Sequence, residues 1–137
     1  MNNSEEFQPG TLVKVQDAVE RMRGTYLNDI LARVNDHVVR VSVRTEPYFW
    51  HRHPESDETF LVLGGQVGVE FEDREVVLGA SEMITVPQGA VHRTRPIGGR
   101  SVNLTVEHRA TTTERVDVAE GNAAGNAGSP RRRTFRP

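Results

Sequence analysis

Three histidines and one glutamate stand at spacings that could bring them to a single metal ion. His51 and His53 are two residues apart, Glu58 follows a short polar stretch, and His92 comes much later in the chain. Residues two apart in a β-strand project from the same face, so His51 and His53 can point in one direction. Divalent metals favour imidazole nitrogen and carboxylate oxygen as ligands. The spacing therefore predicts one metal site, with positions left open for water or substrate as a catalytic site requires.

The residues between these side chains favour the same interpretation. Pro54 ends the first strand, and the polar stretch 55–57 turns the chain so that Glu58 can enter the next strand beside the two histidines. Pro87 and Gly89 shape a tight turn before His92. The alternative is that the histidines only fill a core. We disfavour it, because burying several imidazoles and a carboxylate without partners is costly.

The elements that must position this site are short strands. Apolar runs rich in Val, Ile, Leu and Phe alternate with turn-forming clusters, a rhythm typical of an all-β sandwich or barrel. Gly64-Gly65 and Gly98-Gly99 are two of the predicted turns. We predict strands at residues 30–34, 37–44, 48–53, 59–63, 67–71, 75–78, 83–86, 93–96 and 101–108.

The two ends of the chain differ from this middle part. Residues 1–27 are predicted to form an N-terminal arm, with a possible short strand near residues 12–15 and a short helix from Asp17 that stops before Gly24. Residues 28–110 should form the barrel, and residues 111–137 an extension. From about residue 119 the extension becomes a low-complexity, arginine-rich tail, which we interpret as solvated rather than as a tether to an acidic partner.

Composition excludes several classes of protein. The absence of cysteine excludes disulfides, thiolate nucleophiles and cysteine-ligated zinc. A formal net charge of −2 gives no indication of nucleic-acid binding. No apolar run approaches the roughly 18 residues of a membrane helix, and the first residues do not resemble a secretory signal. We therefore expect a cytoplasmic, single-domain protein that binds neither nucleic acid nor membrane.

Two motifs resemble those of the cupin superfamily. The first motif is matched by His51-x-His53-x4-Glu58-x6-Gly65, and the second by Pro87-x-Gly89-x2-His92. The short spacer between them, together with residues 57–65 and 77–79, is similar to small stand-alone cupins of the mannose-6-phosphate-isomerase-like type.

The resemblance implies a double-stranded β-helix, or jelly roll, and commonly a homodimer. It also implies a metal held by His51, His53, Glu58 and His92. The chain departs from the family pattern at positions that are not metal ligands, which are Thr45, Ser81 and Pro96.

Several functions remain open at this point. The first is a metal-dependent enzyme using a divalent cation as Lewis acid on a small oxygen-rich substrate, of isomerase, cyclase or lyase type, with polyketide ring cyclisation as a subcase. Glu58 could then be a ligand only or a catalytic base. The alternatives are an iron-dependent dioxygenase and a non-catalytic small-ligand-binding module. Zinc and iron are the leading metals, and manganese, nickel and cobalt also suit the ligand set.

Other candidate residues are weaker. His37 and His108 are predicted to be surface or hydrogen-bonded histidines rather than ligands. The aromatic stretch 48–50 suits core packing or a dimer interface, with the mouth of the pocket as the alternative. Tyr26 could serve as an acid or base, but no sequence pattern places it at the site.

Overall fold

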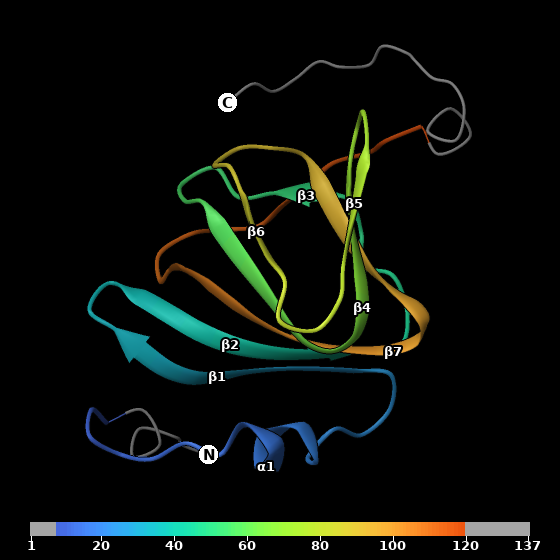
Figure 1. The fold of residues 1–137 in the computed structure, drawn as a ribbon. Coiled ribbons are helices and arrows are strands. Elements are labelled where there is room, and N and C mark those ends of the chain that lie inside the picture. The colour runs from blue at the N-terminus through green and yellow to red at the C-terminus, as the bar shows by residue number, and fades with distance from the viewer. Residues whose placement is uncertain (1–7, 120–137) are drawn as a thin grey trace.

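One short helix and eight strands make up residues 8–119, the part of the chain that the computed structural model describes (Figure 1). The all-β prediction is confirmed, and the arginine-rich tail lies outside the described residues. No helix among residues 8–119 is long and apolar enough to cross a membrane. The elements are α1 (Val15–Val19), β1 (Tyr26–Val34), β2 (His37–Arg44), β3 (His51–Arg52), β4 (Glu58–Phe71), β5 (Glu75–Leu78), β6 (Met83–Val86), β7 (His92–His108) and β8 (Glu114–Arg115).

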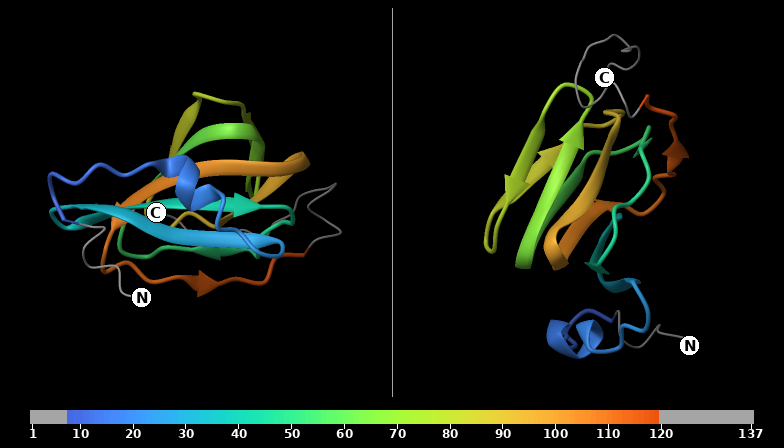
Figure 2. Two further views of the ribbon diagram at one scale, coloured as in Figure 1. Left: turned by 90° about the horizontal axis from the view of Figure 1, so that it is seen from below. Right: turned by 90° about the vertical axis from the view of Figure 1, so that its right-hand side faces the viewer.

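Strand β7 organises the sheet. It pairs antiparallel with β4 along most of its length, and on its other side with β2 and β3. Strand β1 extends the sheet beyond β2, β8 pairs with β3, and β5 and β6 both pair with β4. The sheet therefore curls around an interior, as Figures 1 and 2 show. The register places His51 opposite His92, and Glu58 opposite Glu107.

The turns predicted at the two glycine pairs are wrong. Each pair lies inside a long strand, so β4 and β7 each replace two predicted strands. The register between β4 and β7 shifts on both sides of Gly64, as at a β-bulge. Gly65 has a φ of 69°, and a Cβ there would collide with the carbonyl oxygen of Arg100. Glycine signals a bulge as readily as a turn, and here it lets two long strands bend together.

Three other boundaries differ from the prediction. The strand expected at 48–53 shortens to β3, because residues 48–50 leave the ladder and only His51 pairs with both β7 and β8. β1 begins at Tyr26, where it pairs with Arg44. The predicted strand near residues 12–15 is absent, whereas the helix forms as α1 and ends before Gly24.

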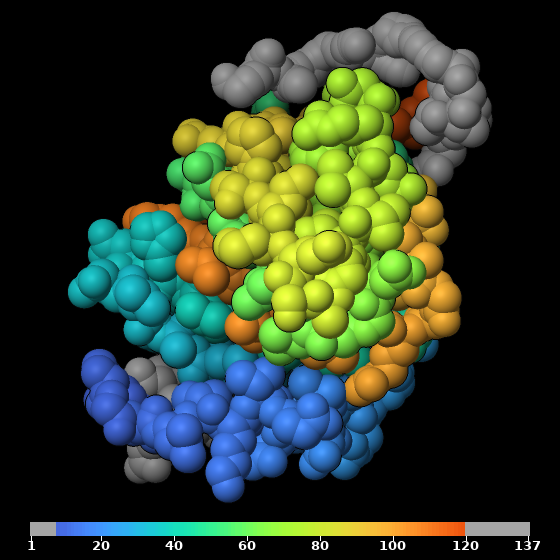
Figure 3. All heavy atoms as spheres, viewed as in Figure 1, coloured from blue at the N-terminus to red at the C-terminus, as the bar shows by residue number. Residues whose placement is uncertain are grey.

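Apolar side chains pack on both sides of the curled sheet. Inside the curl they come from β4, β5 and β6, as Phe60, Val62, Val67, Val69, Leu78 and Val86. On the outer face of β1 and β2, α1 covers a second cluster made of Ala18, Val19, Leu31, Val41 and Val43. The N-terminal segment with α1 forms a separate layer on that outer face (Figures 2 and 3). Alternation along β2 then turns its other side chains towards the interior.

Candidate metal centre

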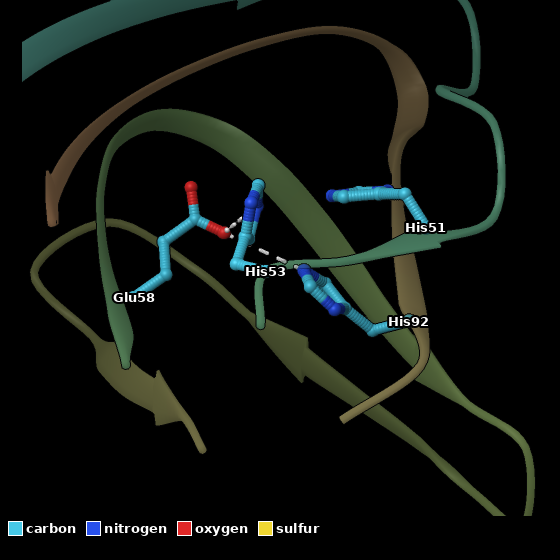
Figure 4. Close-up of side chains that lie close together, drawn as sticks. All are labelled: His51, His53, Glu58 and His92. Atoms are coloured by element: carbon cyan, nitrogen blue, oxygen red, sulfur yellow. Dashed lines mark ion pairs between the residues drawn. The ribbon is translucent and has the colours of Figure 1, made fainter. Parts of the chain in front are cut away.

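The four predicted ligands meet inside the curl of the sheet. One nitrogen or oxygen atom from each of His51, His53, Glu58 and His92 lies within 4.8 Å of the others. Glu58 Oε1 is 3.1 Å from His53 Nε2 and 3.4 Å from His92 Nε2. All four residues are buried, and His92 is fully so. Figure 4 shows the imidazoles and the carboxylate converging from three strands and the loop after β3.

A backbone carbonyl orients each imidazole. The Nδ1 atoms of His51, His53 and His92 lie 2.8, 3.0 and 2.9 Å from the carbonyl oxygens of Phe49, Thr112 and Ala90. A carbonyl oxygen only accepts, so each Nδ1 must carry the hydrogen and donate it. In its neutral form each imidazole therefore turns the lone pair of Nε2 towards the centre, which is the arrangement that metal-ligating histidines adopt.

Two atoms at the centre support the fit of a cation. Glu58 Oε1 and His92 Nε2 are buried and have no hydrogen-bond partner in the structure. Leaving a buried polar atom without a partner costs about 1–3 kcal/mol. Three nitrogens and one carboxylate oxygen form a donor set that would satisfy a divalent cation. The residues present could therefore hold a metal ion.

The pKa values of His51, His53 and Glu58 reflect burial and the neighbouring groups when no metal is bound. Burial, followed by the neighbouring His92, lowers the pKa of His51 to about 3. Burial opposes the charges of His53 and Glu58 as well, but the attraction between the imidazolium and the carboxylate, whose Nε2 and Oε1 atoms are 3.1 Å apart, outweighs it. The pKa of His53 is accordingly raised to about 9, and that of Glu58 is lowered to about 2. A proton on His53 thus occupies the position where a cation would bind.

Hydrogen bonds between loops hold the two cupin motifs together. The backbone N–H of Gln88 donates to Asp57 Oδ1 at 2.8 Å, and its side-chain amide donates to the carbonyl of Pro54 at 2.6 Å. The N–H of Gly89 donates to the carbonyl of His53 at 2.9 Å. These bonds join the turn before His92 to the loop after His53, so the two ligand-bearing segments are positioned as a unit.

The segment after residue 110 also contributes to the site. Thr112 supplies the carbonyl that orients His53, and its N–H donates to the Glu55 carboxylate at 2.8 Å. Strand β8 then pairs with β3. Residues 112–116, predicted above to belong to the C-terminal extension, therefore pack against the ligand-bearing strand.

A cavity of about 280 Å³ opens beside the four ligands. Sequence reasoning missed most of its wall, because residues such as Arg40, Arg44 and Glu107 match no motif. The available signal was alternation, since polar residues occupy every second position in the later parts of β2 and β7. The cavity is lined by Tyr26, Asn28, Arg40, Ser42, Arg44, Tyr48, His51, His53, Glu58, Phe60, Thr94, Asn103, Thr105, Glu107, Thr111 and Thr113.

The other aromatic residues and histidines singled out in the sequence lie at different positions relative to the cavity. Tyr26 and Tyr48 line the cavity, whereas Trp50 is buried. His37 and His108 stand opposite each other in β2 and β7, and their rings contact edge to face at 5.4 Å, outside the four-residue cluster.

One departure from the cupin pattern is explained by the backbone. Ser81 stands where the second motif often has glycine, and its φ of 74° lies in the left-handed region that glycine adopts at least cost. Its N–H donates to the carbonyl of Val62 at 2.8 Å, so the turn keeps this conformation with serine.

Comparisons with known proteins agree with the fold. The Bacillus subtilis (strain 168) protein YdbB, itself uncharacterized, is 47% identical over 89 residues, which cover 64% of this chain and 78% of YdbB. A solved cupin-2 domain protein from Shewanella frigidimarina superposes with a TM-score of 0.67 at 23% identity, covering 72% of this chain and 95% of that one. DMSP lyase DddQ from Ruegeria pomeroyi gives 0.57 at 20% identity, covering 65% and 50%.

The family model of the cupin domain matches residues 37–119. This range contains both motifs, all four candidate ligands and every strand from β2 to β8. The chain therefore belongs to the cupin family.

Proposed function

We propose that this protein is a metal-dependent enzyme that uses a divalent cation as Lewis acid on a small, oxygen-rich organic substrate. The observation that carries the proposal is the convergence of three histidine Nε2 atoms and Glu58 Oε1 beside an open cavity. A cation held by these four residues would polarise a carbonyl or carboxyl oxygen of the substrate and stabilise negative charge that develops there.

Two carboxylates have different roles in this proposal. Glu58 lies among the imidazoles and acts as a metal ligand. Glu107 faces it from β7, lines the cavity, and has a buried Oε1 without a hydrogen-bond partner. Glu107 is therefore the better placed of the two to move a proton on a substrate in the cavity, which changes the catalytic role that the sequence suggested for Glu58.

The cavity volume limits the substrate. At about 30 Å³ for a water-sized group, 280 Å³ holds on the order of ten non-hydrogen atoms. A small acyclic or single-ring compound would fill this space, whereas a fused aromatic polyketide would extend beyond the open side of the cavity. The fold also carries a lyase in the Ruegeria pomeroyi protein, and chemistry of isomerase or lyase type is what we propose here.

Elemental analysis of the natively purified chain tests the metal. We expect about one equivalent, with zinc or iron first and manganese, nickel or cobalt next. The double variant His51→Ala with His53→Ala should lose the metal and any metal-induced rise in melting temperature. The matched control is His37→Ala with His108→Ala, because this second histidine pair lies on the same sheet outside the cluster. Equal metal content in both double variants would contradict the proposal.

Oxygen uptake and product analysis on small enols, diketones and hydroxy acids then separate the activities. Turnover without oxygen consumption is the expected result. Bound iron with stoichiometric oxygen consumption would instead identify a dioxygenase. Binding of these compounds without turnover would identify a small-ligand-binding cupin. Light scattering of the same preparation tests the homodimer that the cupin family leads us to propose.

A further inference from the structure

The net charge of the cavity wall depends on whether a metal ion is bound. Two guanidinium groups, Arg40 and Arg44, and two carboxylates, Glu58 and Glu107, line the cavity, so their formal charges cancel. A divalent cation held as proposed above would leave this wall with excess positive charge. Uncompensated charge in a partly buried cavity is unfavourable. An anionic ligand would compensate it.

Of the two arginines, Arg40 already has partners. Its Nη1 donates to Asn28 Oδ1 at 3.2 Å, and its Nε lies 3.7 Å from Glu107 Oε2. These contacts with β1 and β7 compensate the positive charge of Arg40. Arg40 therefore serves to hold Glu107 and Asn28 in place.

Arg44 is placed differently. Its guanidinium carbon lies 4.3 Å from the ring centroid of Tyr26 and 4.2 Å from that of Tyr48. Within residues 8–119, no carboxylate forms an ion pair with it, and burial lowers its pKa. Contacts with aromatic faces stabilise the cation but provide no carboxylate for its N–H groups. Arg44 is thus a partly desolvated cation that contacts both rings at the cavity wall.

Two further polar atoms in the same cavity lack partners. Ser42 Oγ, two residues before Arg44 on the same face of β2, and Glu107 Oε1 are both buried without a hydrogen bond. A ligand with a hydroxyl or carbonyl group near its charged end could hydrogen-bond to them. The cation, the two rings and these atoms form one continuous wall beside the four candidate metal ligands.

From this arrangement we propose that the substrate is a small organic carboxylate, with its carboxylate on Arg44 and a second oxygen function directed towards the histidine cluster. This inference rests on the proposed function, because the cation creates the excess charge. A carboxylate fits better than a phosphate, because one guanidinium balances a single negative charge and satisfies both carboxylate oxygens, whereas a phosphate carries more charge and a third acceptor oxygen that needs further donors. The lining contains no lysine and no helix N-terminus that would add donors for a phosphate.

The test measures binding to the full chain, loaded with zinc and in parallel treated with EDTA. Titration calorimetry compares L-malate, L-lactate and pyruvate with the uncharged amides malamide and lactamide, and with inorganic phosphate. The zinc-loaded wild type should bind at least one acid at millimolar concentration or below, more tightly than its amide and more tightly than phosphate. This comparison needs no variant, so it holds even if a substitution impairs folding.

Arg44→Gln should weaken binding of the acid by about 10- to 100-fold, the usual effect of losing hydrogen bonds to a charged group. It should leave zinc content unchanged and weaken binding of the amide much less than binding of the acid, and Arg44→Lys should restore part of the affinity for the acid. The matched control is Arg21→Gln, because Arg21 is an exposed arginine paired with Asp29 outside the cavity. This control should bind the acid like the wild type.

Two failures can be told apart. A chain that holds zinc stoichiometrically but binds none of the acids, binds acid and amide equally, or binds the acid unchanged in Arg44→Gln would overturn the carboxylate inference alone. Tighter Arg44-dependent binding of phosphate would overturn it as well. A chain that holds no zinc overturns the proposed function, and acid binding that still depends on Arg44 in that chain would support the anion site independently.

Discussion

Adjacent residues of strand β2 have different roles, because they lie on opposite faces of the sheet. On the outer face, Val41 and Val43 are fully buried beneath α1, next to Leu31 of β1. On the inner face, Ser42 and Arg44 line the cavity beside the histidine cluster. At Val41 and Val43 the outer face is apolar and leaves no polar side chain to satisfy. At Arg40, Ser42 and Arg44 the inner face is polar, and these side chains line the cavity.

Buried polar atoms without a hydrogen-bond partner show the same difference between the two faces. Among residues 8–119, the buried side-chain atoms without a hydrogen-bond partner are Ser42 Oγ, Glu58 Oε1, His92 Nε2 and Glu107 Oε1. All four belong to the cavity wall or to the four-residue cluster. Buried polar atoms normally have partners, so their concentration on one face marks where a cation and a substrate would supply them. The fold thus separates the face that stabilises it from the face where we propose that ligands bind.

The largest expected effect comes from removing a ligand on the inner face. His92→Ala should reduce bound metal from about one equivalent to a small fraction, because it removes one of the four donor atoms and leaves a void at a fully buried position. The metal-induced gain in the free energy of unfolding, about 4 kcal/mol at a thousandfold excess over Kd, should disappear with it. Elemental analysis and urea unfolding with and without metal measure both quantities. Retention of a full equivalent of metal would show that His92 is not a ligand.

The next effect comes from the outer face. Val41→Ala should lower the free energy of unfolding by about 2 kcal/mol, from the lost burial of two carbons and the cavity that they leave. Metal content should stay unchanged, because Val41 points away from the cluster. Urea unfolding with EDTA and elemental analysis separate the two outcomes. Loss of metal in this variant would mean that the faces are not independent.

Raising the pH should have an intermediate effect on the free energy of unfolding. The pKa of His53 is raised from 6.5 to about 9, so its stabilising effect is complete below pH 6.5 and is lost as pH rises through 9. Burial, with the nearby charge of Glu58, raises the pKa of Glu107 from 4.5 to about 7. The free energy of unfolding therefore also falls as the pH rises from 4.5 to about 7. His51 is neutral throughout, since its pKa is about 3.

The EDTA-treated protein should therefore lose stability between pH 6.5 and 9. The metal-loaded protein should gain stability over the same range, because fewer protons compete with the metal for His53. Urea unfolding of both forms at several pH values measures this. Parallel pH profiles would show that His53 does not exchange a proton for the metal.

The smallest effect is expected one residue away from Val41. Ser42→Ala removes a buried hydroxyl that has no partner, so the free energy of unfolding should change by less than about 1 kcal/mol, in the stabilising direction. The same urea experiment compares it with Val41→Ala. A loss as large as that of Val41→Ala would mean that the Ser42 hydroxyl contributes to folding, and the contrast between the faces would fail.

Local sequence was sufficient for the all-β class, the helix before Gly24 and the four clustered side chains. The two-residue spacing of His51 and His53 specifies their common face in any strand, because alternation is a property of the backbone. The turn before His92 is equally local. These features depend on neighbours in the chain, so they could be predicted without knowing which strands pair.

Long-range pairing decided the rest. The same glycine pairs can form turns or bulges, and only the pairing of β4 with β7 makes them bends within long strands. The cavity wall depends on register, since a one-residue slip would exchange Arg44 for a neighbour on the opposite face. Thr112 reaches His53 across 59 positions of the chain, and no local pattern signals that contact. Residue types and spacing thus determined which side chains could bind a metal, whereas strand register determined what surrounds them.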